Sequence, residues 1–499
     1  MGLCNTEKDI LWGFMKKLKK RSGILVRAVC VAAVAFLACF AGYAAGTGVL
    51  PLNTIEDVAP EAPSFSKNDF VGSLQEALRT GTISDALSLY GSLPADYAED
   101  TDLLLLKASL LISDSRFDDA KKICMALNAK DASNTDAIEL LAYIAKLQGN
   151  SAERTKQIKL LLAKDAYNPA ANMELAQDYF DNKNYTQARL YYKKALVREP
   201  DNEDALFGLG QSDYFLGAKD SSKDKEAEET FRKILEKDPA YAPAYSYLGK
   251  IASANNEYRR ASEQIKKAIE IDPTNYDYFM DYGTYERYLG HYEVAEEAWT
   301  KAISIQPDYF LAYAYRAGLY DEQDKYDLAL LDYENVLKYN PQYYFANESI
   351  GVLAIHQKQW KKARLAFEKC MEMDKTGNIS YPLMVTYCYY MEKDKLGAKK
   401  FSDKVLRKLD RNSIDYAMLR VFHDEAGEMP LPQKINAIDN SNKKGKMYFY
   451  LGLFYDMFGG IEAAKQFYTK VVDMKSPMFF EYRLAEWRME ADAGSIKTN

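Results

Sequence analysis

Side chains that could carry chemistry are few in this sequence, and they are widely separated. There are three histidines, His291, His356 and His423, and none has a second His or a Cys at a spacing suited to a metal ion. No phosphate-binding, dinucleotide-binding or nucleophile-elbow motif is present, and Gly459-Gly460 is typical of a turn. We therefore expect no enzyme activity, no cofactor and no metal site.

The cysteines do not form a disulfide framework. Cys124, Cys370 and Cys388 are far apart and odd in number, whereas the other three cysteines lie within the first 39 residues. Buried packing as small apolar side chains explains Cys124, Cys370 and Cys388 better than redox chemistry does.

Composition predicts a folded protein. The 499 residues are 48% hydrophobic and 27% charged, with a net charge of -7. That negative charge argues against a nucleic acid partner or an anionic lipid surface for the chain as a whole. Tyrosine is unusually frequent, with 39 residues, and its positions bear on function.

The N-terminal region carries a membrane signal. A cationic segment, residues 1–22, contains five lysines and arginines at 16–21, and residues 28–50 then lack any charge. As a helix those 23 residues would span about 35 Å, enough to cross a hydrocarbon core of about 30 Å. We predict a transmembrane anchor or signal segment at 23–50 and a proline-rich linker at 51–66. The positive charge before the segment places everything downstream outside the cytosol.

Three fates are open for this hydrophobic helix. It could stay as a signal anchor, or be cut as a secretory signal near Ala44, Ala45 and Gly46. Alternatively, Phe36-Leu37-Ala38-Cys39 resembles a bacterial lipoprotein box, which would make Cys39 the lipidated residue.

A repeat of 34 residues dominates the rest of the chain. Pro239, Pro273, Pro307 and Pro341 are each 34 residues apart. If places 1 to 34 are counted from Ala242, Tyr276 and Phe310, the first residues of three consecutive units, large residues recur at places 4, 10, 17 and 24, and small ones at 8 and 20. Places 4, 7, 8 and 10 share one face of a first helix, and 17, 20, 24 and 27 share one face of a second. Each unit is therefore predicted to be an antiparallel helical hairpin.

This period, the small residues at places 8 and 20 and the terminal proline resemble the tetratricopeptide repeat family. The chain departs from the family at place 11, usually aromatic, where Ala252, Glu286 and Tyr320 stand. The resemblance implies an all-α fold, a right-handed solenoid of helical hairpins that binds proteins or peptides in a concave groove.

The repeat register defines the domain organisation. Nine units cover 67–377, a weak tenth covers 378–411, and the array 67–411 is clearest over 169–377. One unit is longer by five residues, which we place in a polar loop at 218–223. An interrupted helical region, 412–442, precedes a final unit and capping helix within 443–494, and the outer face of the helix 478–491 is expected to be wet.

Aromatic residues suggest a binding surface. Tyr258, Tyr292, Tyr326 and Tyr333 fall on core places. Others fall on places 2, 5, 6, 9, 12 and 13, which face the concave side in the family this chain resembles. The predicted partner-binding residues are Phe207, Tyr214, Phe215, Tyr247, Tyr288, Tyr315 and Phe345. The alternative is that these rings pack against the next hairpin.

The leading functional prediction is a membrane-tethered scaffold or adaptor in the bacterial periplasm, which gathers cell-envelope enzymes or assembly factors. The final unit and the helix after it are similar to the end of outer-membrane tetratricopeptide lipoproteins that act as adaptors of peptidoglycan hydrolases. The alternative is a cytosol-facing, membrane-anchored co-chaperone or import receptor, which requires the inverted topology.

Overall fold

The computed structural model describes residues 65–475 and 479–496, with side chains to residue 490, and this part of the chain contains helices and no strands. The predicted cationic segment, the hydrophobic helix 23–50 and Cys39 lie outside the described residues. Within the described part, no helix is both long and apolar enough to cross a bilayer. Internal contacts divide the chain into unit 1, up to Pro239, and unit 2, from Ala240 onward.

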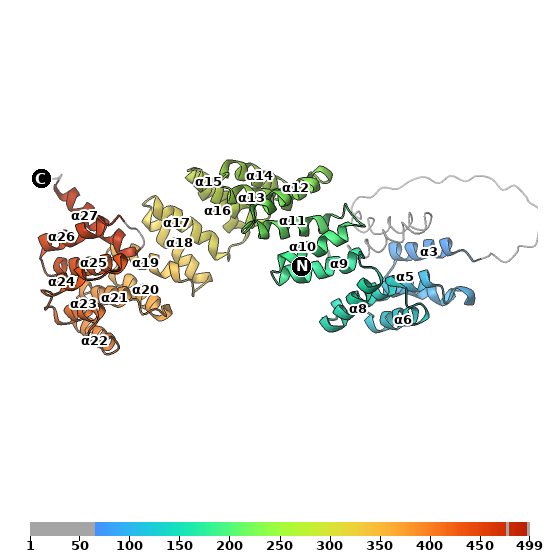
Figure 1. Cartoon of the computed structure of the whole chain (residues 1–499), viewed down its shortest axis with the longest axis horizontal. Helices are drawn as coiled ribbons and strands as arrows, with labels where there is room; N and C mark the ends of the chain where they lie inside the picture. Colours follow the sequence, from blue (N-terminus) through green and yellow to red (C-terminus); the bar gives the residue numbers. More distant parts are fainter. Residues whose placement is uncertain (1–64, 476–478, 497–499) are drawn as a thin grey trace, which may run out of the picture. The chain divides into compact units, whose positions relative to one another are not determined.

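Unit 1 contains successive helical hairpins whose helices pack on their neighbours in chain order (Figure 1). Its elements are α3 (Lys67–Thr80), α4 (Ile83–Ser88), η1 (Leu89–Ser92), η2 (Ala95–Tyr97), α5 (Thr101–Ser113), α6 (Phe117–Lys130), α7 (Thr135–Leu147), α8 (Ser151–Lys164), α9 (Pro169–Asp181), α10 (Tyr185–Leu196), α11 (Glu203–Gly217) and α12 (Ser221–Lys237).

Unit 2 continues the hairpins and ends in a more irregular group of helices. Its elements are α13 (Ala242–Ala254), α14 (Tyr258–Ile271), α15 (Tyr276–Tyr288), α16 (Tyr292–Ile305), α17 (Phe310–Glu322), α18 (Tyr326–Tyr339), α19 (Tyr344–His356), α20 (Trp360–Met373), α21 (Ser380–Met391), α22 (Lys395–Leu406), α23 (Ile414–Asp424), α24 (Leu431–Asn436), α25 (Ser441–Met457), α26 (Ile461–Val472) and α27 (Phe480–Ile496).

A left-handed residue at place 15 closes the hairpin turns. Asn256, Asp324 and Lys358 occupy this place with φ near +60°. In the turn after α13, the Glu257 amide then donates to the Ala252 carbonyl at 2.9 Å, which satisfies an end carbonyl of the helix. The tight turn brings each second helix back along the first.

The small residues at places 8 and 20 meet as predicted. A Cβ added to Gly249 would lie 3.2 Å from the carbonyl oxygen of Ala261, so the two helices of that hairpin are nearly in backbone contact. In the next hairpin, a Cβ on Gly283 would lie 2.5 Å from the buried Trp299 ring at place 24. The pattern of small and large residues is therefore one of close packing.

Two predicted units differ from a simple helix pair. The second helix of the unit 67–100 is only the six-residue α4, followed by the short turns η1 and η2. The five extra residues of the longer unit do not form the predicted loop at 218–223. Instead α11 and α12 have 15 and 17 residues, against 13 and 14 in α13 and α14. The insertion is absorbed because extra helical turns keep their backbone hydrogen bonds.

Two side chains on core places behave unexpectedly. Tyr292, predicted to be buried, is 42% exposed at the start of α16. Glu286, which stands where the family usually has an aromatic residue, is buried. Its carboxylate accepts a hydrogen bond from the Ser262 hydroxyl and lies 2.7 Å from His291 Nδ1. A satisfied polar group therefore replaces an aromatic ring in this hairpin.

The last predicted helix is present and packs on the repeats of unit 2. α27 packs against α25, α26 and α19 (Figure 1). From Phe479 to Met489 no side chain is exposed, and Glu490 is the first exposed residue. One face of the helix therefore packs along the repeats of unit 2, while side chains such as Arg483 and Arg488, each with 33% of its surface accessible, still meet solvent.

Candidate functional site

In unit 2 the predicted groove residues lie on the first helices of consecutive hairpins. Tyr288 closes α15, Tyr315 is on α17 and Phe345 begins α19, with 59%, 46% and 64% of their surfaces exposed. Tyr247 on α13 is half-buried, and the Lys250 ammonium lies 5.2 Å from its ring centroid. Exposed rings are thus available on three successive first helices.

Each exposed ring also leans on a neighbouring ring. Tyr288 stacks on Tyr258, with centroids 4.5 Å apart and planes at 10°. The Tyr315 ring lies 5.8 Å from that of Trp299, and Phe345 lies 5.7 Å from Tyr344. Tyr288 and Tyr315 thus rest on a ring of the preceding helix, which restricts their orientation, whereas Phe345 meets a ring next to it in sequence.

In unit 1 the predicted rings are covered to a greater extent. Phe215 stacks on Tyr185 at 4.7 Å and also meets Tyr214 at 5.2 Å. Phe207 lies edge-on to the buried Phe231 at 5.9 Å. Only Phe215 among the three predicted residues is exposed. The rings of unit 1 therefore pack both within a hairpin, as Phe207 does on Phe231, and between hairpins, as Phe215 does on Tyr185.

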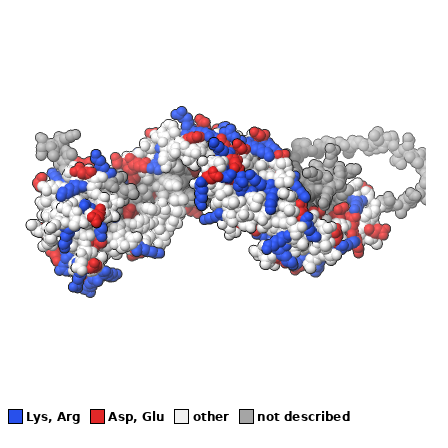
Figure 2. Space-filling model, in the orientation of Figure 1, with Lys and Arg blue, Asp and Glu red and all other residues white. Residues whose placement is uncertain are grey.

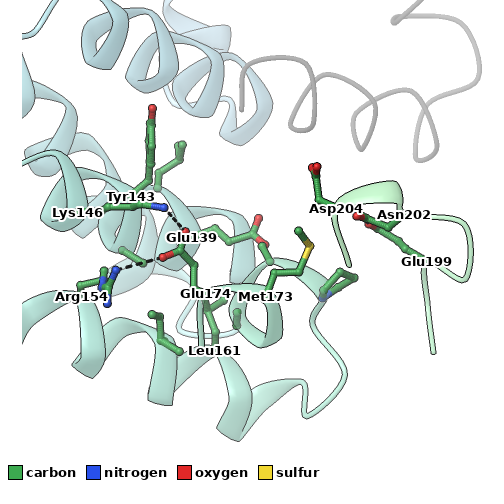
Figure 3. A pocket seen from close by; sticks show the side chains of 16 residues that line it. Glu139, Tyr143, Lys146, Arg154, Leu161, Met173, Glu174, Glu199, Asn202 and Asp204 are labelled. Atoms are coloured by element: carbon green, nitrogen blue, oxygen red, sulfur yellow. Dashed lines mark hydrogen bonds and ion pairs between the residues drawn. The ribbon is translucent and has the colours of Figure 1, made fainter. Parts of the chain in front are cut away.

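Unit 1 contains a pocket of about 330 Å³ that the sequence did not predict (Figure 3). Leu140 and Ala142 of α7, Ile158 and Leu161 of α8, and Ala171 of α9 supply apolar lining. Figure 3 shows Met173 between Glu174 on one side and the group Glu199, Asn202 and Asp204 on the other.

An ion-pair cluster lies at one side of this pocket, between two neighbouring hairpins. The Arg154 guanidinium pairs with Glu174 at 3.3 Å and with Asp178, and the Lys146 ammonium lies 2.5 Å from Glu174. Arg154 occupies place 20, where the clear repeats carry a small residue. Because a long cation fills this place, α8 and α9 are joined by charges, which leaves room for the pocket.

The sequence contained one signal for the pocket, the arginine at place 20. Tyr143 is part of the lining, but the acidic residues come from α7, α9, α11 and the loop before α11, so spacing alone could not group them. The predicted aromatic residues and the pocket are therefore different surfaces.

Burial governs the ionisation of the downstream cysteines and of His356. Burial raises the pKa of both the Cys124 and Cys370 thiols to about 12, and it raises that of Cys388 as well. Burial, with the nearby Arg483, lowers the pKa of His356. No cluster of three metal-ligating side chains occurs in the part of the chain that the structure describes. The three downstream cysteines are core residues, as predicted.

Charges of both signs are interleaved on the face shown in Figure 2, with a group of Lys and Arg over α22. Part of this group is paired, since Glu425 lies 2.7 Å from Lys395 and 3.2 Å from Lys399.

These helical hairpins, stacked in register with rings and a pocket on their surfaces, define a repeat solenoid of the kind that binds other proteins. The chain contains tetratricopeptide repeats. One family model described as tetratricopeptide repeat matches residues 173–222, 281–335 and 316–370, and another matches residues 242–275.

Solved structures similar to this chain include several tetratricopeptide repeat proteins. One from Parabacteroides merdae is 19% identical, covering 50% of this chain and 97% of its own, with a TM-score of 0.38. PilF of Pseudomonas aeruginosa is 21% identical, covering 45% and 97%, with a TM-score of 0.33. YrrB, a repeat protein with an unusual peptide-binding site, is 19% identical, covering 37% and 93%, with a TM-score of 0.32.

No curated protein matches the chain. The similarity of the final unit to lipoprotein adaptors of peptidoglycan hydrolases therefore stays a prediction.

Proposed function

We propose that this protein is a non-enzymatic, membrane-tethered scaffold whose repeats bind other proteins of the bacterial cell envelope on the extracytoplasmic side. Tetratricopeptide repeat proteins mediate protein–protein interactions and are typically non-enzymatic. The observation that carries the proposal is the set of exposed rings on successive first helices, Tyr288, Tyr315 and Phe345.

Exposed, oriented rings favour a protein or peptide partner for a physical reason. Aromatic side chains bury a large area on binding and lose little conformational freedom, so they dominate many interfaces. Tyr288 and Tyr315 are already held by Tyr258 and Trp299, which lowers the entropy cost of binding further.

The tether and the orientation rest on the sequence. The uncharged residues 28–50 follow a cationic segment, and this asymmetry favours an extracytoplasmic solenoid. A reporter that is active only outside the cytosol, fused after Asn499, should be active. Activity solely of a cytosolic reporter would favour the co-chaperone or import receptor.

The binding face can be tested with matched variants. Proteins captured from membranes by the wild-type chain should be lost when Tyr288, Tyr315 and Phe345 are all changed to Ala. The control changes Leu331 and Leu365 to Ala, because these leucines are exposed to similar extents, 56% and 49%, on the second helices α18 and α20. Equal loss of capture in both variants would reject the first-helix face as the binding surface.

A further inference from the structure

The C-terminal helix α27 lies on the repeat face where a partner would be expected. Its Arg483 reaches Asp321 of α17, and its Trp487 lies against His356 of α19. Its Glu481 meets Tyr450 of α25. Asp321, His356 and Tyr450 occupy places 12, 13 and 6 of their units, which the family resemblance assigns to the concave side.

Aromatic contacts hold the first turn of α27. The Phe480 ring stacks on Phe367, with centroids 5.5 Å apart and planes at 28°, and on Tyr381, at 6.2 Å and 12°. These rings belong to α20 and α21, so a single side chain of α27 spans two hairpins.

Arginine and tryptophan hold the following turns. An Arg483 Nη atom donates to Asp321 Oδ2 at 2.8 Å, and the guanidinium lies 4.3 Å from the Trp487 ring centroid. The Trp487 ring lies 4.1 Å from His356. Arg488 donates to Asp456 Oδ2 and to the Tyr387 hydroxyl, both at 2.6 Å. Charge-assisted and cation–π contacts of this kind are typical of recognition interfaces. They stand beside apolar contacts, since Leu484 and Ala485 are buried in the same cluster as Tyr450.

One residue of α27 fits its site poorly. The Glu481 side chain is fully buried, and its Oε1 accepts a hydrogen bond from Tyr450 at 2.8 Å. Its Oε2 meets no donor among the described residues. Burial raises the pKa of Glu481, although the nearby Lys446 charge opposes this shift. Burial and the charge of Glu481 raise the pKa of Glu348. A helix with an uncharged residue at this position would avoid the cost of burying a carboxylate.

We propose that α27 is an internal ligand in a helix-binding site of unit 2, formed by α17, α19, α20, α21, α25 and α26, and that a partner protein's amphipathic helix binds there in its place. The partner helix carries an aromatic residue, an arginine three positions later, a tryptophan four positions after that and then a second arginine. Its residue next to the first aromatic is uncharged. This inference deepens the proposed function, because it assigns a partner chemistry to the same repeat face.

The test uses the full chain with a protease site inserted between Lys475 and Phe479. After cleavage, a fluorescent peptide of residues 479–499 should exchange into the site, as measured by anisotropy, whereas the uncut protein should take up little of it. A peptide with Arg483→Glu and Trp487→Ala should bind at least about tenfold more weakly. A peptide with Glu481→Gln should bind more tightly than the natural one.

Two results would overturn the proposal. The first is unfolding of unit 2 on cleavage, seen by circular dichroism, and the second is a folded, cleaved protein that takes up no peptide over days. Hydrogen exchange on the uncut chain gives an independent reading, because α27 should open without α25. If the two helices exchange only together, α27 is a permanent part of the core. These outcomes are separate from the Tyr288, Tyr315 and Phe345 test, which concerns capture of partners by the intact chain.

Discussion

The buried carboxylate of Glu481 predicts a pH-dependent stability that a single substitution removes. Because burial raises the folded-state pKa of Glu481 above its ordinary value of 4.5, the protonated form is favoured in the docked helix. The stability that protonated Glu481 contributes is fully present at low pH. It is lost as the pH rises from about 4.5 through the raised folded-state pKa, since ionisation then requires a charge inside the protein.

The Glu481→Gln variant should keep the Tyr450 hydrogen bond through its carbonyl oxygen, and it stays neutral at every pH. Because the variant never has to bury a charge, it should be more stable than the wild type at pH 8, by about 1–3 kcal/mol if the cost resembles that of an unsatisfied buried group. Near pH 4.5 the two proteins should differ little. The variant also removes the repulsion between the Glu481 and Glu348 carboxylates, and this too should make the variant more stable than the wild type at pH 8.

Hydrogen exchange of residues 479–490 is a suitable assay, because repeat arrays often unfold in more than one step and a global melting curve would average them. Protection of α27, corrected for the intrinsic effect of pH, should fall between pH 5 and pH 8 in the wild type and stay level in Glu481→Gln. Lower protection of the variant at pH 8 would show that the site needs a negative charge, and the reasoning would be refuted.

Three further predictions concern the repeats, each measured by thermal and urea unfolding. Gly283→Ala should destabilise by about 1–3 kcal/mol, because the new Cβ would lie 2.5 Å from the buried Trp299 ring; a neutral result would mean that the ring can move. Asp332→Ala should lower the free energy of unfolding by about 3 kcal/mol, because the Arg316 guanidinium would lose two hydrogen bonds of 2.7 and 2.9 Å in a largely buried site. An unchanged unfolding midpoint would contradict this. Lys358→Gly should raise the free energy of unfolding by about 0.5–1 kcal/mol, because the residue has a φ of 59°, which glycine adopts more easily than lysine does. A lower unfolding midpoint would refute the turn argument.

The hairpins could be predicted from the sequence because they depend on contacts within one repeat. Gly249 and Ala261 meet across one hairpin, and Gly283 receives Trp299 from the helix next in sequence. Such pairs recur every 34 residues, so the pattern shows both the period and the close-packed positions. The burial of Cys124 follows from the same register.

Features that depend on contacts between distant segments could not be predicted. α27 reaches Asp321, 162 positions before Arg483, and no periodicity links the two residues. The pocket beside Arg154 arises from a departure from the repeat, whose effect depends on where Glu174 and Asp178 lie. Tyr292 occupies a core place yet is exposed, so the register identifies a helix face more reliably than the burial of each side chain.

The central claim, that the first helices of unit 2 form the protein-binding face, can be tested by photo-crosslinking in intact cells. A benzophenone amino acid would replace Tyr315 or Phe345 in two proteins, and Leu331 or Leu365 in two controls with comparable exposure on the second helices. The first two proteins should form crosslinks to the same partner, and the controls should form few or none. Crosslinks to that partner from Leu331 and Leu365 alone would contradict the account.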